Sequence, residues 1–277
     1  MTDGTSPTNP ILGVLSFVGR RFIAVLDQIG TAMWLMFEAV GWVVRSITQK
    51  KVRIGRRAIV SQIVRVGVRS VFIVGLVSGC VGFILALQMS PPLDDFGQKD
   101  KVANITGVAV LRELGPLIAA IVLTGFAGAA IAAEIGTMVV GEEIEALEAH
   151  ALNPVRFLVV PRVIATVVSM TCLAVFSDWI AISAGYLVGV YALGIEGDVY
   201  YRNTLDQVKL VDFLTGIGKA TVFGLLIGLI SCMNGLRVTG GAAGVGNATT
   251  GTVVQSIVAI IIADLIFTGI FYSVGWV

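Results

Sequence analysis

Charged residues are scarce in this chain. Of its 277 residues, only 13% are charged and 56% are hydrophobic, and the mean hydropathy is +0.92. A soluble domain carries about 25% charged residues, so the composition indicates an integral membrane protein. The apolar runs are long and do not alternate with polar residues, which excludes a membrane β-barrel. The expected fold class is therefore all-α, a polytopic membrane helix bundle.

Histidine and cysteine are almost absent. The chain has one histidine, His150, and three cysteines, Cys80, Cys172 and Cys232, each inside an apolar run. An odd number of cysteines with a single histidine favours neither a disulfide framework nor a metal site. The formal net charge is only +1. Neither a metal nor a nucleic-acid partner is expected.

A nucleotide-binding loop is also missing. Gly218-Lys219 has the ending of a phosphate-binding loop, but Phe213 stands where that motif needs its first glycine. The chain is therefore not expected to be an enzyme that hydrolyses nucleotide. The glycine-rich stretch 240–246 does not fit the dinucleotide fingerprint either, and we interpret it as a flexible cytoplasmic turn.

Five apolar stretches are long enough to cross a bilayer, for which about 20 residues are needed. They cover residues 70–89, 102–138, 155–194, 211–235 and 252–277. Residues 11–47 are apolar but broken by charges, and their best uncharged run is too short to cross. We interpret this segment as an amphipathic helix in the membrane interface, with Trp34 and Trp42 at headgroup depth; the alternative is a sixth span.

The chain is thus divided into a disordered terminus (1–10), an interfacial helix with a basic segment (11–69) and a five-span domain (70–277). Basic loops remain cytoplasmic, which places the N-terminus in the cytoplasm and the C-terminus outside. The stretch from Arg45 to Arg69 holds eight basic residues and no acid: Arg45, Lys50, Lys51, Arg53, Arg56, Arg57, Arg65 and Arg69.

Several charges fall in or near the spans, where an unpaired charge costs at least about 2.5–3.5 kcal/mol. Two interpretations remain open: ion pairs that lock helices together, or a polar lining for a substrate path. Lys219 and Asp264 lie on consecutive spans and could pair, whereas the neighbours Arg112 and Glu113 point about 100° apart and need partners elsewhere. The full set is Arg112, Glu113, Glu134, Asp178, Lys219 and Asp264.

A short acidic segment, residues 142–151, separates the second and third spans. Ile144, Leu147 and Ala151 share one helical face, so the segment is either a solvated surface helix or a helix seated in the groove of a cytoplasmic protein. Its acidic residues include Glu142, Glu143, Glu145 and Glu148.

Three segments carry a family resemblance: LRELGPLIAAIVLTGFAGAAIAAEIGTM (111–138), EEIEALEAHALNPVRFLVVPRVIA (142–165) and GLRVTGGAAGVGNATT (235–250). Together they resemble the MlaE/YrbE-type permease family, the membrane subunits of MCE-associated ABC lipid transporters. The resemblance covers about residues 60 to 277. The family's polar positions match Arg112, Glu113, Lys219 and Asp264.

The resemblance implies a permease subunit in a bacterial inner membrane that moves phospholipid or a similar lipid toward or from a periplasmic MCE-domain protein. It also implies a second permease chain, expected to be another copy, and a cytoplasmic ABC ATPase dimer that uses ATP. No cofactor is expected in this chain. Residues 142–151, including Glu142, Glu143, Ile144, Leu147, Glu148 and Ala151, map to the coupling helix that contacts the ATPase.

Two other functions compete with this hypothesis. An ion-coupled secondary transporter of a small apolar solute would use Glu113, Asp178 and Asp264 as proton sites. Inverted repeats would favour it, and none is evident in the sequence. A non-transporting membrane scaffold is the third possibility, which the dense charge within the spans disfavours.

Overall fold

The computed structural model describes residues 10–48 and 55–275, and every regular element in these ranges is helical. Residues 1–9, which belong to the terminus predicted to be disordered, lie outside the described ranges, as do Lys50, Lys51 and Arg53 of the basic segment.

Five helical stretches are long and apolar enough to cross a membrane, which confirms the predicted number of spans. The first consists of α2 (Arg56–Val66), η1 (Val68–Ser70) and α3 (Val71–Asp95). The second consists of η2 (Lys99–Lys101), α4 (Val102–Ala109), η3 (Val110–Leu114), α5 (Gly115–Leu123), η4 (Thr124–Gly128) and α6 (Ala129–Val140). The others are η5 (Val155–Val159) with α8 (Val160–Tyr191), then α10 (Leu210–Leu236) and α11 (Gly241–Val274).

Two helical stretches begin earlier than predicted. The first stretch begins at Arg56 instead of residue 70, so the basic residues from Arg56 to Arg69 lie along a helical stretch and not in a loop. The flexible turn predicted for residues 240–246 is mostly helix, because α11 begins at Gly241. Residues 237–240 connect α10 to α11, and Gly240 and Gly241 have φ of 85° and 69°, a backbone region that only glycine enters readily.

The third span is the centre of the bundle. In its apolar central part 67% of the residues are buried, whereas the corresponding share in the fifth span is 6%. Helix α8 packs along both α3 and α10. Large buried side chains such as Met170 of α8 and Phe223 of α10 meet in the core. Most of the apolar surface of α11 is therefore exposed and does not pack against the rest of the chain.

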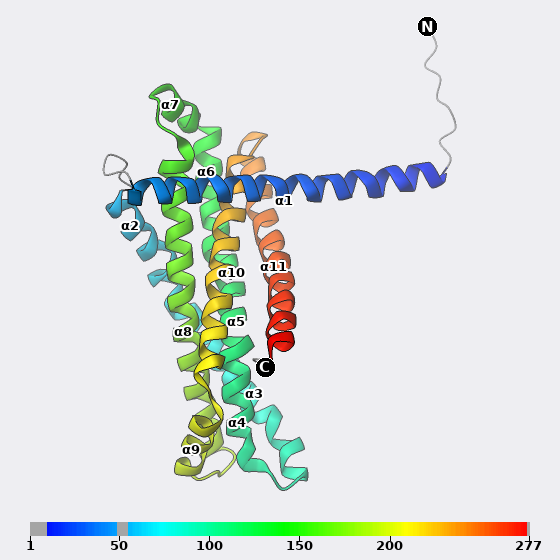
Figure 1. Cartoon of the computed structure of the whole chain (residues 1–277), viewed down its shortest axis with the longest axis vertical. Coiled ribbons are helices and arrows are strands. Elements are labelled where there is room, and N and C mark those ends of the chain that lie inside the picture. Colours follow the sequence, from blue (N-terminus) through cyan, green and yellow to red (C-terminus); the bar gives the residue numbers. More distant parts are fainter. Residues whose placement is uncertain (1–9, 49–54, 276–277) are drawn as a thin grey trace.

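The first helix, α1 (Pro10–Thr48), crosses the bundle at a steep angle (Figure 1). Its own residues Leu35 and Ala39 are buried, whereas Trp34 is 73% exposed. Arg237, just after α10, lies 3.1 Å from Asp27 and so ties α1 to the bundle. Helix α1 is not among the candidate spans, which removes support for a sixth span, and its place in the membrane interface stays a prediction.

The two ends of the bundle differ. Helix α7 (Glu143–Ala149), α1 and the turn before α11 gather at one end, and α9 (Gly197–Gln207) and the α3–α4 connection at the other (Figure 1). In the second group, burial raises the pKa of Tyr200 on α9 to about 12, so this side chain is neutral. The arrangement is the one that five antiparallel crossings require.

Labelling of single cysteines tests the predicted orientation. In a background with Cys80, Cys172 and Cys232 replaced by serine, we expect Gly97→Cys to react with a membrane-impermeant thiol reagent added outside the inner membrane. Thr48→Cys, at the opposite end of the bundle, should react only after the membrane is permeabilised, because basic segments stay cytoplasmic. The reverse pattern would overturn the orientation.

Candidate functional site

The second span carries two adjacent charges, Arg112 and Glu113, inside a π-helical turn, η3. Such turns are rare insertions in α-helices and occur frequently at functional sites. Each charge has its own partner on α10: Arg112 lies 2.6 Å from Asp212, and Glu113 lies 2.6 Å from Lys219. The expectation that these neighbours find separate partners is confirmed.

Lys219 is the centre of a buried polar cluster. Its ammonium nitrogen lies 2.6 Å from Glu113 Oε2, 2.9 Å from Asp264 Oδ1 and 2.9 Å from the Thr268 hydroxyl. The Thr268 hydroxyl in turn donates to Glu113 Oε1 at 3.0 Å. The predicted contact between Lys219 and Asp264 is therefore present, but Glu113 is a third member that the pairwise prediction missed. Three spans meet at this one cation.

Asp212 was not among the predicted site residues. It is 1% exposed, and besides the contact with Arg112 its Oδ2 accepts a hydrogen bond from the Lys209 backbone amide at 2.8 Å. This bond caps the start of α10 in the manner of a helix-capping residue at the third position. The sequence signal that could have drawn attention to Asp212 is an acid three residues after Lys209, the residue that precedes the apolar helix, and this signal indicates a cap rather than an ion pair.

Asp212 and Lys219 are seven residues apart, two helical turns, and therefore lie on the same face of α10. Gly216 lies between them on this face. A Cβ atom there would stand 2.2 Å from the Leu111 carbonyl oxygen, so the helix backbones touch at this point. The two ion pairs lie on either side of the closest approach, and the glycine allows both to form.

Asp178 of α8 lies beside this region but outside the ion pairs. A Cβ atom on Gly115 would stand 1.7 Å from Asp178 Oδ1, so the carboxylate rests on the glycine backbone. Among the described residues, Asp178 Oδ1 has no hydrogen-bond partner. Its neighbour Ser177 donates to the Gly115 carbonyl at 3.1 Å and lies 2.7 Å from the Ser78 hydroxyl.

Glu134 belongs to a separate cluster. Its two carboxylate oxygens lie 2.7 Å from Arg65 Nη1 and 3.1 Å from Arg162 Nη2. This bridge ties α2, α6 and α8 together. The six predicted polar residues are thus not one site: four lie in the linked pairs of η3, α10 and α11, Asp178 lies next to them, and Glu134 is apart.

The helix predicted for residues 142–151 is shorter than expected. Helix α7 ends at Ala149, and Ala151 has a left-handed backbone with φ of 57°, so it does not continue the face of Ile144 and Leu147. Ile144 packs on the chain's own core, and Leu147 is half-buried. All four glutamates of the segment are exposed: Glu142, Glu143, Glu145 and Glu148.

The close contact at Gly216 can be tested with two neighbouring glycines. Gly216→Ala should destabilise the protein by about 1–3 kcal/mol, the usual cost of overpacking, because the new methyl group meets the Leu111 carbonyl. Gly218→Ala is the matched control, since no atom lies within 4 Å of its Cβ position, and alanine there should be neutral or stabilising. Thermal unfolding of the two purified variants measures the difference. Equal changes in stability would contradict a close backbone contact at Gly216.

The cluster around Lys219 makes a second prediction. Lys219→Met alone leaves two carboxylates without their cation and should cost about 3–5 kcal/mol. Adding Asp264→Leu should recover only part of this loss, because Glu113 is still uncompensated. The triple variant with Glu113→Gln should be the mildest for stability. A thermal-stability cycle over the single, double and triple variants measures the coupling, and simple additivity would refute a shared cluster.

Comparison with known proteins agrees with this architecture. The family described as Permease MlaE matches residues 59–270. A probable ABC transporter permease protein of Rickettsia felis is 35% identical over 95% of this chain and 100% of its own length. A probable ABC transporter permease of Synechocystis is 33% identical over 80% of this chain and 84% of its own length.

The intermembrane phospholipid transport system permease protein MlaE of Haemophilus influenzae is 31% identical over 96% of this chain and 100% of its own length. The matched region contains all six polar residues predicted within the spans, together with Asp212 and helix α7. The chain therefore belongs to the MlaE permease family.

Proposed function

We propose that this chain is the permease subunit of an ABC transporter that moves phospholipid or a similar lipid between the inner membrane and a periplasmic MCE-domain protein. The observation that carries the proposal is the family match across residues 59–270. The relative from Haemophilus influenzae is named for intermembrane phospholipid transport. The five apolar helices provide the membrane part that such a subunit needs.

The polar cluster suggests how the chain would handle a lipid headgroup. The side chains of Lys219 and Asp212 are 1% exposed and so serve to hold helices together. Those of Arg112 and Glu113 are 22% and 36% exposed, so they are the members that a headgroup can reach. A guanidinium is well suited to bind phosphate. Structural and lipid-path roles are thus divided within one network.

ATP hydrolysis belongs to a partner in this proposal, because the chain has no phosphate-binding loop. Helix α7 is the contact to that ATPase, and its exposed carboxylates rather than its apolar face meet the partner. A second copy of this chain and an MCE-domain protein complete the assembly. The exposed apolar surface of α11 is available for lipid or for the second permease.

The ion-coupled alternative has less support. A proton site needs a carboxylate that is not tied up in the fold, whereas Glu113 and Asp264 both form ion pairs with Lys219. Asp178 is the one carboxylate of the three that no ion pair holds among the described residues. Dependence of lipid transfer on ATP, and not on a proton gradient, distinguishes the two functions.

A charge reversal on α7 tests the proposal. The double variant Glu145→Lys with Glu148→Lys should leave the permease folded, because both side chains are exposed, but should reduce copurification of the ATPase by about tenfold or more, as expected when charges across an interface are made repulsive. ATP-dependent transfer of fluorescent phospholipid by the reconstituted complex should fall in parallel.

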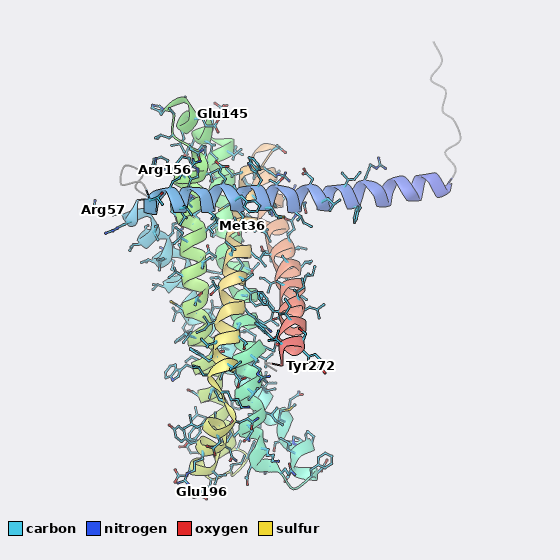
Figure 2. All side chains as sticks on the ribbon, in the orientation of Figure 1. Met36, Arg57, Glu145, Arg156, Glu196 and Tyr272 are labelled. Carbon is cyan, nitrogen blue, oxygen red and sulfur yellow. The ribbon has the colours of Figure 1, made fainter. Side chains whose placement is uncertain are left out.

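Glu196→Lys is the matched control, since Glu196 is also exposed but lies at the opposite end of the bundle from Glu145 (Figure 2). It should retain both the ATPase and transfer. If the wild-type complex contains no ATPase, or transfers lipid equally without ATP, the proposed function is wrong. If the wild-type complex contains the ATPase and the α7 double variant retains it as well, the contact with the ATPase is elsewhere.

A further inference from the structure

An apolar groove lies beneath α1, away from the polar cluster. Its volume is about 240 Å³, and its wall consists of hydrophobic side chains. A closed apolar cavity of about 150 Å³ is enough to hold benzene, so the groove can take a stretch of hydrocarbon chain. The lining residues are Met36, Ala39, Val40 and Val43 of α1, Val160, Val163, Ile164, Val167 and Val168 of α8, and Leu225 and Leu229 of α10.

Two cations stand at one end of this groove. The guanidinium groups of Arg45 and Arg156 lie 5.2 Å and 5.7 Å from the centre of the Trp42 ring. Arg156 also lies over the Phe157 ring, at 5.4 Å. Glu38 of α1 also lies in this region, and its carboxylate accepts a hydrogen bond from Asn153 at 3.3 Å. Two cationic side chains thus lie beside aromatic rings, a combination found at membrane interfaces.

On the α8 side, the arginine is in line with the wall of the groove. Arg156 precedes Val160 by one helical turn, and Val163 and Val167 continue the same stripe toward the middle of the bundle. From Val160 to Val168 the helix rises about 12 Å. On α1, Val43 lines the groove next to Trp42, two residues before Arg45. Figure 2 shows Arg156 and Met36 along the part of α1 that crosses α8 and α10.

We propose that this groove binds one acidic phospholipid of the surrounding bilayer, with its phosphate at Arg45 and Arg156 and one acyl chain along Val160 to Val168. The bound lipid fastens α1 to the bundle. The site shares no residue with the cluster of Arg112, Glu113 and Lys219, so it does not depend on lipid being the transported substrate.

The headgroup, not the acyl chain, gives the site its selectivity. Lipid tails are as apolar as leucine, so moving a tail from the bilayer into the groove yields little hydrophobic driving force. Any lipid could fill the groove, and only an attraction to the headgroup retains one kind. Basic residues near the membrane surface attract acidic lipids, and two arginines at one end of the groove supply this attraction.

Photolabelling tests the proposal on the full chain in lipid nanodiscs. The probes are phosphatidylglycerol and phosphatidylcholine, each with a photoreactive group on one acyl chain. With phosphatidylglycerol we expect labelling of the peptides that contain residues 36–43 and 160–168, about tenfold above that with phosphatidylcholine. Unlabelled phosphatidylglycerol should compete, and unlabelled phosphatidylcholine should not.

Two kinds of variant test the two parts of the site. Arg45→Gln with Arg156→Gln should remove the preference for phosphatidylglycerol, while Arg20→Gln, at the exposed far end of α1, should keep it. Val40→Phe fills the groove from its 51% exposed position and should abolish labelling by both lipids. Val44→Phe, equally exposed one turn further on but outside the lining, should have no effect.

Equal labelling by the two lipids in the wild type, or a preference that survives loss of both arginines, would show ordinary annular lipid and overturn the proposal. Unchanged labelling in Val40→Phe would place the lipid elsewhere and overturn it as well. Because the charge variant and the filling variant act at different places, misfolding of one leaves the other as a valid test.

Discussion

The burial of Lys219 is the constraint on which the rest of the bundle depends. A buried ammonium group needs compensating charge, and here the compensation comes from Glu113 on the second span and Asp264 on the fifth. Each of these helices must therefore present one particular face, at one particular height, to α10. The cluster sets the rotation of three spans in a protein whose apolar surfaces alone specify rotation poorly, because bilayer and side chains are similarly apolar.

Close helix packing makes this electrostatic arrangement possible. Gly216 lets the backbones of α10 and η3 touch between the two ion pairs, and Gly115 does the same for the carboxylate of Asp178. The π-helical turn at Val110–Leu114 lies at the same level. Small residues, an irregular helical turn and paired charges thus coincide at one level of the bundle, next to side chains of Arg112 and Glu113 that remain partly exposed. The positions of these two partly exposed side chains are fixed by their buried partners, Asp212 and Lys219.

Helix α1 is attached to the bundle at a different place from the polar cluster. Helix α1 lies across the bundle and is fastened by Leu35, Ala39 and the ion pair between Asp27 and Arg237. An apolar groove remains beneath it, for which we propose a bilayer lipid as the occupant. Helix α7 shows a related division: Ile144 packs on the chain's own core, whereas the carboxylates are exposed.

The sequence by itself determined the all-helical class, the five spans and the charges that require partners, because hydropathy and the cost of buried charge depend on composition along the chain. It also carried the motifs of the family. Only the tertiary structure decided which charges meet. Glu113 joins Lys219 and Asp264, and Arg112 pairs with Asp212, which was not among the predicted site residues. Glu134 belongs to a separate bridge. The tertiary structure likewise decided that α11 begins at Gly241 and that Ile144 faces inward. These outcomes depend on how helices distant in sequence rotate and approach one another, and periodicity within one helix contains no information about its neighbour.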